Sequence, residues 1–418
     1  MSNGDRNDVL VIGGGAIGVA SAYYLARRGA AVTLVEKGEV CSGCSYGNAG
    51  LLVPSHSVPL AAPGVVAQGL KWMGRPDSPF YIRPRVDAQL ISWLWRFYRS
   101  ANHRHVRRSV PLLRDLSLAS LELYDELDRI EGFDFDLVRN GYLQVGKQRY
   151  SREDAEVRIL NEAGVAAHVL TREEAQELVP ETELEIGGAI HFPQDWNLSP
   201  HRFVTGLAAQ AASLGADIRT GTEVLGFERN GSRVSLVKTT RGDFSPGEIV
   251  LAAGSWSPVV ARDLSLSLPI QAGKGYSITY KRPPQAPSIP ISLAEARVGV
   301  SSMGEYLRFA GTLELSGLTL YLDPVRLAAI LKAVPEYMPG LDPGKLEMVE
   351  IWRGMRPCTP DGLPLLGRPE SLANLTVAAG HAMIGVSLAP ITGKLVSEIV
   401  CGEEPGIDLA LTRPERFG

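Results

Sequence analysis

Residues 9–29 read VLVIGGGAIGVASAYYLARRG, and residues 32–38 read VTLVEKG. The run Val9–Ile12 is apolar and ends on glycine, which predicts a buried strand. A helix is expected from about Ala16 to Arg28, closed by a glycine, and a second strand over Ala31–Val35. Together these stretches predict a β-α-β unit.

Three glycines at the junction of strand and helix have the spacing G-x-G-x-x-G. Gly13 permits a tight turn, Gly15 lets the backbone approach a diphosphate, and Gly18 lets helix and strand pack closely. The free N–H groups of the helix N-terminus favour an anion. Glu36 ends the second strand, where an acid meets ribose hydroxyls and disfavours a 2′-phosphate. The motif therefore predicts a site for FAD or NAD rather than NADP.

The composition is that of a globular protein with two domains. The chain has 418 residues, of which 45% are hydrophobic and 21% charged, and this length exceeds one ordinary core. A formal net charge of −4 argues against nucleic acid as the main partner. Cys41 and Cys44 form a C-x-x-C that lacks the second pair of a structural zinc site, so we expect no metal.

Nothing in the sequence predicts export or a membrane span. The N-terminal residues lack the charged region followed by an apolar region that a signal peptide requires. No stretch of about 18 uncharged apolar residues is present. The 4 cysteines form no disulfide framework, which indicates a reducing compartment. We therefore expect a cytoplasmic protein.

Segments of the nucleotide-binding type return in the middle of the chain and near its C-terminus. They are a helix over 199–214, a strand over 248–252, a strand over 375–379 and a helix over 385–400. The remaining pattern predicts an irregular Pro-rich stretch up to residue 84, a helical segment over 87–130, and mostly strands over 268–349. The simplest arrangement is one cofactor domain built from three separated stretches, with a sheet-rich domain inserted between them.

Further motifs follow the first one: CSYGNAGLLVPS (44–55), LAAPG (60–64), LAAGSWSP (251–258), GKGYSITY (273–280), WRGMRPCTPDGLPLLG (352–367) and AAGHAMIGVSLAPITGKLVSEIV (378–400). With these motifs, nearly the whole chain resembles the flavin-dependent amine oxidoreductases of the D-amino acid oxidase and glycine oxidase superfamily. Within it, the likeness is to the bacterial D-amino acid dehydrogenases.

The resemblance implies FAD as the cofactor and an α/β fold, in which a Rossmann-type FAD-binding domain carries an inserted sheet-rich α+β substrate domain. We expect the FAD-binding domain to comprise residues 1–55, 198–267 and 352–418. The substrate domain would comprise residues 56–197 and 268–351.

The resemblance also assigns a flavin site. The loop after the second strand would lie along the flavin, where small residues let the backbone pass close to a flat ring. A helix N-terminus after Gly385 would face the flavin pyrimidine edge and stabilise negative charge there. His381 either contributes to this site or is a buried structural histidine. The expected cofactor-binding residues are Gly13, Gly15, Ala16, Ile17, Gly18, Glu36, Lys37, Ser45, Asn48, Ala49, Gly50, Leu51, Val224, Ala253, Gly254, Gly380, His381, Ile384 and Gly385.

Three residues are expected to serve the substrate. In the enzymes it resembles, the arginine before the proline of the WRGMRP motif pairs with the substrate carboxylate, and here that arginine is Arg356. A planar guanidinium suits this bidentate task, although an arginine bridging the domains is the alternative. Tyr276 would be a second ligand, with Lys274 on the same strand face by alternation. His56, which follows the flavin loop, is the third candidate.

The implied reaction is the oxidation of a small D-amino acid, with D-proline or a hydroxyproline-like substrate included. The α-hydrogen leaves as hydride to the flavin N5, and the imino acid hydrolyses or stays cyclic. Electrons would pass to a quinone or another acceptor of the respiratory chain. The alternative is an oxidase that uses O₂ on glycine-like or sarcosine-like amines, with a covalent flavin link at Cys358 left open.

Residues 71–108 contain nine Lys or Arg residues, two Asp residues and seven aromatic residues. Aromatic and basic side chains together suit the headgroups of an anionic membrane. One hypothesis is therefore peripheral contact with the inner face of the cytoplasmic membrane. The other is an ordinary amphipathic helix with a buried aromatic face and a solvated basic face.

Overall fold

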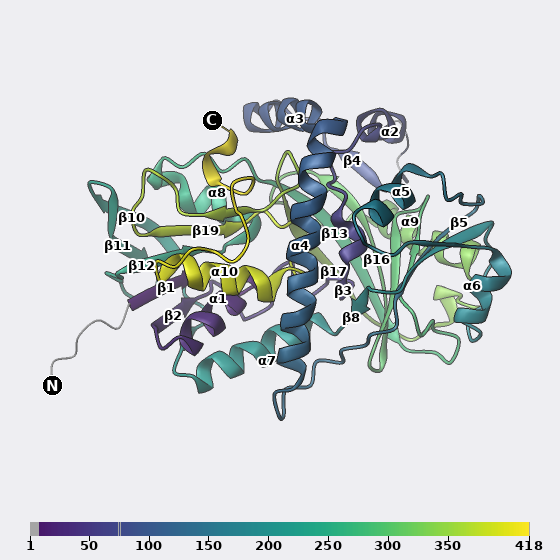
Figure 1. The fold of residues 1–418 in the computed structure, drawn as a ribbon, viewed down its shortest axis with the longest axis horizontal. Helices are drawn as coiled ribbons and strands as arrows, with labels where there is room; N and C mark the ends of the chain where they lie inside the picture. Colours follow the sequence, from purple (N-terminus) through teal and green to yellow (C-terminus); the bar gives the residue numbers. More distant parts are fainter. Residues whose placement is uncertain (1–7, 74, 76, 418) are drawn as a thin grey trace.

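The computed structural model describes residues 8–73, 75 and 77–417. Residues 1–7 and 418 of the predicted cofactor domain, and residues 74 and 76 of the basic segment, lie outside the described residues. Two β-sheets make up the two halves of the molecule, and the long helix α4 (His103–Asp128) runs across their junction (Figure 1).

The first sheet is the predicted dinucleotide-binding sheet. Its strand order is β18-β19-β12-β1-β2-β9, with all strands parallel except β18, which is antiparallel to β19. The bounds are β1 Asp8–Ile12, β2 Ala31–Val35, β9 Asp217–Arg219, β12 Glu248–Leu251, β18 Leu365–Gly367 and β19 Leu375–Ala379. Its strands come from the beginning, the middle and the end of the chain, as the sequence predicted.

Helices α1 (Ala16–Arg27), α7 (Pro200–Ser213) and α10 (Ala389–Val400) share one apolar core against this sheet. A Cβ added at Gly393 of α10 would lie less than 3.0 Å from the backbone of Ala20 in α1, so glycine is what permits their close contact. A second core holds the hairpin β10–β11 and the segment around α8. Their bounds are β10 Val224–Asn230, β11 Arg233–Thr239 and α8 Ser257–Val260.

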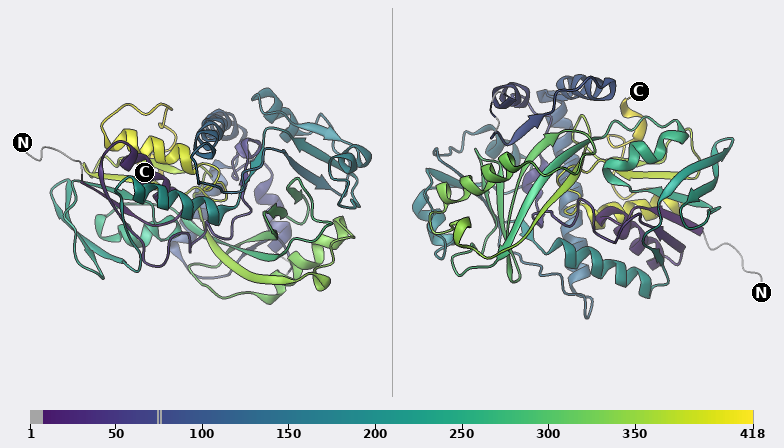
Figure 2. Two further views of the ribbon diagram at one scale, coloured as in Figure 1. Left: turned by 90° about the horizontal axis from the view of Figure 1, so that it is seen from below. Right: turned by 180° about the vertical axis from the view of Figure 1, so that it is seen from behind.

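The second sheet has the order β17-β13-β16-β15-β14-β5-β7-β6, and β4 also pairs with β16. One of its faces packs against α9 around a core of apolar side chains (Figure 2). The strands are β4 Phe80–Ile82, β5 Tyr142–Gly146, β6 His168–Leu170, β7 Gly188–Phe192, β13 Gln271–Lys281, β14 Ile291–Leu293, β15 Val298–Met303, β16 Tyr306–Leu315 and β17 Met348–Cys358. The helices are α2 Val65–Met73, α3 Ala88–Ser100, α5 Ala155–Glu162, α6 Arg172–Leu178 and α9 Pro324–Tyr337.

Short elements complete the chain. A two-stranded pair joins the halves: β3 Leu51–Leu52 with β8 Trp196–Asn197. The 3₁₀ helices are η1 Pro54–Ser57, η2 Gly254–Trp256, η3 Ala261–Leu264, η4 Pro343–Lys345 and η5 Pro414–Phe417.

Several predicted bounds differ from the structure. The helical segment expected over 87–130 is two helices, because Asn102 caps a new one by accepting a hydrogen bond from the His105 backbone N–H at 3.0 Å. The stretch expected to be irregular up to residue 84 contains α2. The helix expected from Gly385 begins at Ala389.

The predicted division into two domains stays a prediction, and two observations bear on its boundaries. Residue 352 lies inside β17, which pairs with β13 of the second sheet along its length. Helix α4 was expected in the substrate domain, yet its apolar side chains pack in the core of the first sheet's helices.

Candidate functional site

The turn between β1 and α1 requires its glycines. Gly13 has a φ of +114°, which disfavours any other residue. A Cβ added at Gly18 would lie less than 3.0 Å from the carbonyl oxygen of Gly13. At Gly15 the nearest neighbour to an added Cβ is the Ser45 hydroxyl oxygen, 3.5 Å away. The Ser45 hydroxyl therefore lies at the N-terminus of α1, where a diphosphate would bind.

Glu36 lies where the ribose is expected. Its carboxylate accepts hydrogen bonds from the backbone N–H groups of Gly14 at 2.7 Å and of Gly38 at 2.9 Å. These bonds fix the carboxylate beside the phosphate turn and leave oxygen lone pairs for a ribose hydroxyl. The next residue, Lys37, turns aside, with its Nζ 3.9 Å from the centroid of the Trp256 ring.

The predicted flavin loop, residues 44–53, bridges the phosphate turn and the C-terminal segment. At one end, the Ser45 hydroxyl accepts a hydrogen bond from the Ala16 N–H at 3.0 Å. At the other, the Asn48 side-chain amide donates to the carbonyl of Met383 at 3.2 Å. The loop therefore connects two of the three chain stretches that the sequence assigned to one site. The small residues Ala49 and Gly50 follow, and Leu51 begins β3.

The loop has an anchor that sequence reasoning missed. The guanidinium of Arg308, on β16, donates to the backbone carbonyls of Tyr46 at 2.7 Å and Asn48 at 3.0 Å. Glu350 Oε1 lies 3.4 Å from it, and burial lowers the Arg308 pKa. The one signal in the sequence was a lone cation within the apolar stretch YLRFAGTL.

The C-terminal segment passes close to the flavin loop. The Ser387 hydroxyl accepts a hydrogen bond from the Val53 N–H at 3.0 Å. His381 is buried, and burial lowers its pKa to about 3, so its ring is neutral. Its Nε2 lies 3.1 Å from the Thr392 hydroxyl, while Nδ1 has no partner among the described residues. Ile384 and Gly385 form a partly buried turn before α10.

The remaining predicted cofactor residues line the other side of the first sheet. Val224 begins β10 and packs, like Ala253, against the second core of this half. Gly254 has a φ of +54°, and an added Cβ there would meet nothing within 4 Å. Open space at the end of β12 is what a bound nucleotide needs.

Arg356 faces the junction of the two halves. On β17 it lies on the same face as Trp352, four residues earlier, whose ring would collide with a Cβ added at Gly47 of the flavin loop. Its guanidinium donates to the carbonyl of Thr312, and burial lowers its pKa. The titratable groups that act on it in the described part of the chain are the thiols of Cys44 and Cys358, and no carboxylate is among them. A partly buried cation without a counter-ion is suited to an anionic ligand.

Tyr276 does not lie with Arg356. The Arg356 guanidinium lies over Gly275, and Tyr276 follows it on β13, so its side chain points to the opposite face. There its hydroxyl donates to Glu314 at 2.7 Å. Lys274 shares that face, as alternation predicted, and its Nζ lies 3.2 Å from Glu314.

His56 is also engaged elsewhere. It lies in η1, with its ring edge toward Tyr142 at a centroid distance of 5.8 Å. Burial, with help from the Arg297 charge, lowers its pKa to about 4. The structure shows no contact between His56 and Arg356.

No group of three or more His, Cys, Asp or Glu residues able to hold a metal ion occurs within the described ranges 8–73, 75 and 77–417. Cys358, the candidate for a covalent flavin link, is buried against the aromatic cluster of Trp93, whose ring N–H donates to its carbonyl at 3.0 Å. Burial raises the pKa of its thiol to about 12.

A Rossmann sheet and a second sheet thus meet at a glycine-rich loop, with an uncompensated arginine beside it. That architecture is typical of oxidoreductases that use a dinucleotide cofactor. The model of the DAO family, described as FAD dependent oxidoreductase, matches residues 8–399. The chain belongs to this family, which confirms FAD as the cofactor, and the glycine turn, Glu36 and the flavin loop fit it.

The names of similar curated proteins and solved structures agree with this family. The D-amino acid dehydrogenases of Bradyrhizobium diazoefficiens and Paramagnetospirillum magneticum are 32% and 33% identical, each alignment covering 98% of this chain and 98% of theirs. The structure of glycine oxidase from Geobacillus kaustophilus has a TM-score of 0.78 and 26% identity, covering 98% of this chain and 99% of that one. L-proline dehydrogenase from P. horikoshii, 22% identical, shares the fold with a TM-score of 0.78. The predicted family and fold class are confirmed.

Proposed function

We propose that this enzyme oxidises a D-amino acid to the imino acid and passes the electrons to an acceptor other than O₂. The observation that carries the proposal is Arg356, a partly buried guanidinium with no carboxylate neighbour in the described chain, beside the flavin loop. A cation in this position needs an anionic partner, and an amino acid brings one. The names of the full-length relatives support the D configuration and the dehydrogenase activity.

The chain itself contributes position and charge rather than a nucleophile. Arg356 would bind the substrate carboxylate through two N–H groups and thereby fix the α-carbon relative to the loop of small residues. FAD, when bound, supplies the two-electron acceptor for the α-hydrogen. His56 and His381 have pKa values lowered to about 4 and about 3, so neither acts as an imidazolium acid at neutral pH.

The electron acceptor we propose is a quinone, reached by peripheral contact with a membrane. None of the helices in the described part of the chain is long and apolar enough to cross a bilayer. Helix α2 instead has no buried residue, and α3 turns Trp95 and Tyr98 outward with 60% of each exposed. Leu70 of α2 is 63% exposed. These side chains form an apolar surface along one edge of the molecule, where α2 and α3 lie near each other (Figure 1).

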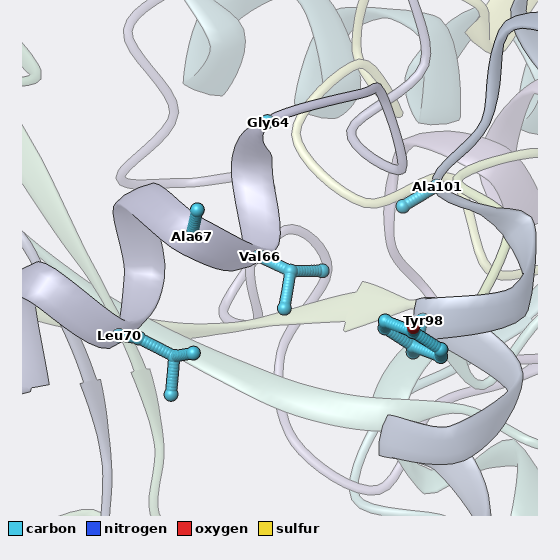
Figure 3. Close-up of a pocket in the computed structure, with 6 residues that line it drawn as sticks. All are labelled: Gly64, Val66, Ala67, Leu70, Tyr98 and Ala101. Carbon is cyan, nitrogen blue, oxygen red and sulfur yellow. The ribbon is translucent and has the colours of Figure 1, made fainter.

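The two helices enclose a shallow hollow of about 310 Å³. Figure 3 shows Val66 and Leu70 of α2 on one side of it and Tyr98 of α3 on the other. An apolar hollow open to solvent, flanked by an exposed Trp, suits insertion at the level of lipid headgroups.

Basic side chains surround this surface without counter-ions. The two acids of the segment, Asp77 and Asp87, already pair with Arg75 and Arg85. Among the described residues of the 71–108 segment, the exposed basic side chains that form no ion pair are Lys71, Arg83, Arg99, Arg104, Arg107 and Arg108. An uncompensated positive surface around an apolar one favours an anionic phospholipid membrane.

Anaerobic titration tests the function. We expect D-amino acids to bleach the visible band of the bound flavin, and a soluble quinone to restore it much faster than air. Bleaching followed by rapid recolouring in air with peroxide would make the protein an oxidase, the activity of the glycine oxidase structure it resembles. A flavin that no D-amino acid reduces would refute the proposed substrate.

A further inference from the structure

Strand β16 carries one extra residue beside Arg356. Tyr276 of β13 pairs with Gly311 of β16. Two residues back along β13, Lys274 pairs with Glu314, three residues further along β16. This is a β-bulge, a feature that redirects a strand locally and is enriched beside active sites.

Thr312 is the first residue of the bulge and has an unusual backbone. Its φ is +67°, in the left-handed region, which a β-branched residue rarely occupies and where such bulges normally place glycine. Its carbonyl accepts a hydrogen bond from Arg356 Nη1. The disfavoured backbone conformation therefore directs the Thr312 carbonyl toward the Arg356 guanidinium. Backbone strain of this kind is enriched at functional sites.

Gly275 lies opposite the bulge and makes room for the same guanidinium. A Cβ added there would lie less than 3.0 Å from three guanidinium atoms of Arg356. Any other residue would push the guanidinium off the sheet.

We propose that Gly275 and the Thr312 bulge form a seat that orients Arg356 toward the substrate carboxylate. The inference rests on the proposed function, since it adds positioning residues to that site. One guanidinium edge is held by the Thr312 carbonyl, which leaves the other N–H groups for the two carboxylate oxygens.

The opposite face of the sheet locks the bulge. Glu314 is 5% exposed, and its carboxylate accepts from the Tyr276 hydroxyl at 2.7 Å and lies 3.2 Å from Lys274 Nζ. Arg326 Nε lies 3.7 Å both from Glu314 and from Asp323. The two cations, Lys274 and Arg326, thus balance the two carboxylates of Glu314 and Asp323. Neither carboxylate is therefore left to serve as a counter-ion for Arg356. Tyr276 and Lys274 flank Gly275, which makes Tyr276 a positioning residue rather than a substrate ligand.

The test is Gly275→Ala in the FAD-bound enzyme, with Gly340→Ala as the matched control, because a Cβ added at Gly340 meets nothing within 4 Å. The probe is benzoate, a carboxylate without an α-amino group, titrated against the visible flavin spectrum. We expect the benzoate Kd and the KM for a D-amino acid to rise about 10- to 100-fold, with kcat much less affected and FAD content unchanged. If Gly275→Ala leaves both the benzoate Kd and the KM unchanged, the proposal that Gly275 helps to orient Arg356 is wrong.

Two further variants keep the proposal falsifiable if Gly275→Ala does not fold. Thr312→Gly keeps the carbonyl and relieves the backbone, so benzoate binding should stay close to that of the parent enzyme. Tyr276→Phe removes only the hydroxyl that holds Glu314, and should raise the benzoate Kd about 5-fold. Loss of benzoate binding in Thr312→Gly would contradict the proposal. An unchanged benzoate Kd in Tyr276→Phe would also contradict it. A parent enzyme that binds benzoate but is not reduced by D-amino acids would refute the proposed function and leave the seat standing.

Discussion

The Nη1 atom of Arg308 lies 3.0 Å from the carbonyl oxygen of Asn48, and this hydrogen bond joins the second sheet to the flavin loop. The same nitrogen donates to the carbonyl of Tyr46 at 2.7 Å, so the loop backbone curves around one charge. Glu350 balances that charge at 3.4 Å. The cofactor loop thus takes its shape from a residue more than 250 positions away in sequence.

Replacing Arg308 with Met should weaken FAD binding. The substitution leaves two loop carbonyls without their donor and removes the cation that faces Glu350, so we expect the FAD Kd to rise about 10- to 100-fold. Quenching of FAD fluorescence on titration into apoprotein measures this constant. Arg172→Met is the control, because Arg172 is an exposed arginine that pairs with Glu185 at 3.5 Å. Equal FAD affinity in both variants would show that Arg308 does not hold the loop.

Arg356→Lys should damage substrate binding while sparing the flavin. A lysine keeps the charge but loses the planar pair of donors, so we expect the KM for a D-amino acid to rise about 100-fold. Steady-state kinetics with a quinone acceptor gives KM and kcat separately. Arg353→Lys is the matched control: Arg353 has the opposite strand parity, and its Nε donates to the carbonyl of Leu320 at 2.6 Å. A KM equally raised in both variants would argue against Arg356 as the carboxylate ligand.

The cofactor half could be predicted from the sequence because its signals are local. The glycines of the phosphate turn are required within one β-α-β unit, and the structure places Gly13, Gly18 and Glu36 as that unit demands. The arrangement of the second sheet depends on pairing between strands. Whether Tyr276 shares a face with Arg356 is decided by the register of β13 against β17, which pairs Tyr276 with Arg353, and that register leaves no mark in the sequence.

Long-range packing also explains why the break between α3 and α4 and the role of Arg308 were not predicted. The helical pattern over 87–130 continues across Asn102, so the pattern does not show where α3 ends and α4 begins. The Asn102 cap and the packing of α4 against α1 and α10 show that the two helices belong to different parts of the fold. No motif surrounds Arg308 in the sequence, because it acts on the flavin loop, which is distant in sequence and contacts Arg308 only in the folded chain.

Asp195 should make stability depend on pH. Its carboxyl is fully buried, and burial raises its pKa from 3.8 to about 7, although hydrogen bonds from Ser55 oppose the shift. As pH rises from about 4 to about 7, the unfolded chain releases this proton first, so folding loses up to about 4 kcal/mol. Asp195→Asn keeps a hydrogen-bond acceptor for Ser55 and should remove this contribution to the pH dependence of the free energy of unfolding.

Thermal unfolding at saturating FAD, followed between pH 5 and pH 8, measures the difference. Asp134→Asn is the control, because the Asp134 side chain is 78% exposed. Its pH dependence should follow that of the parent protein. Superimposable profiles for Asp195→Asn and the parent protein would mean that Asp195 does not titrate in this range.

Trp95→Glu should release the enzyme from anionic membranes. Trp95 stacks on Tyr98 at a centroid distance of 6.0 Å on the exposed side of α3, and a carboxylate there opposes both burial in headgroups and attraction to anionic lipid. The measurement is co-sedimentation with vesicles of phosphatidylglycerol and phosphatidylcholine. We expect the parent protein to bind at low salt and less at high salt, since screening weakens the basic surface. Leu225→Glu, a substitution at an equally apolar side chain that is 63% exposed on β10, should bind like the parent. If the parent protein binds at neither salt concentration, or Trp95→Glu binds as well as Leu225→Glu, the α2–α3 surface is not a membrane contact, and the acceptor must reach the flavin from solution.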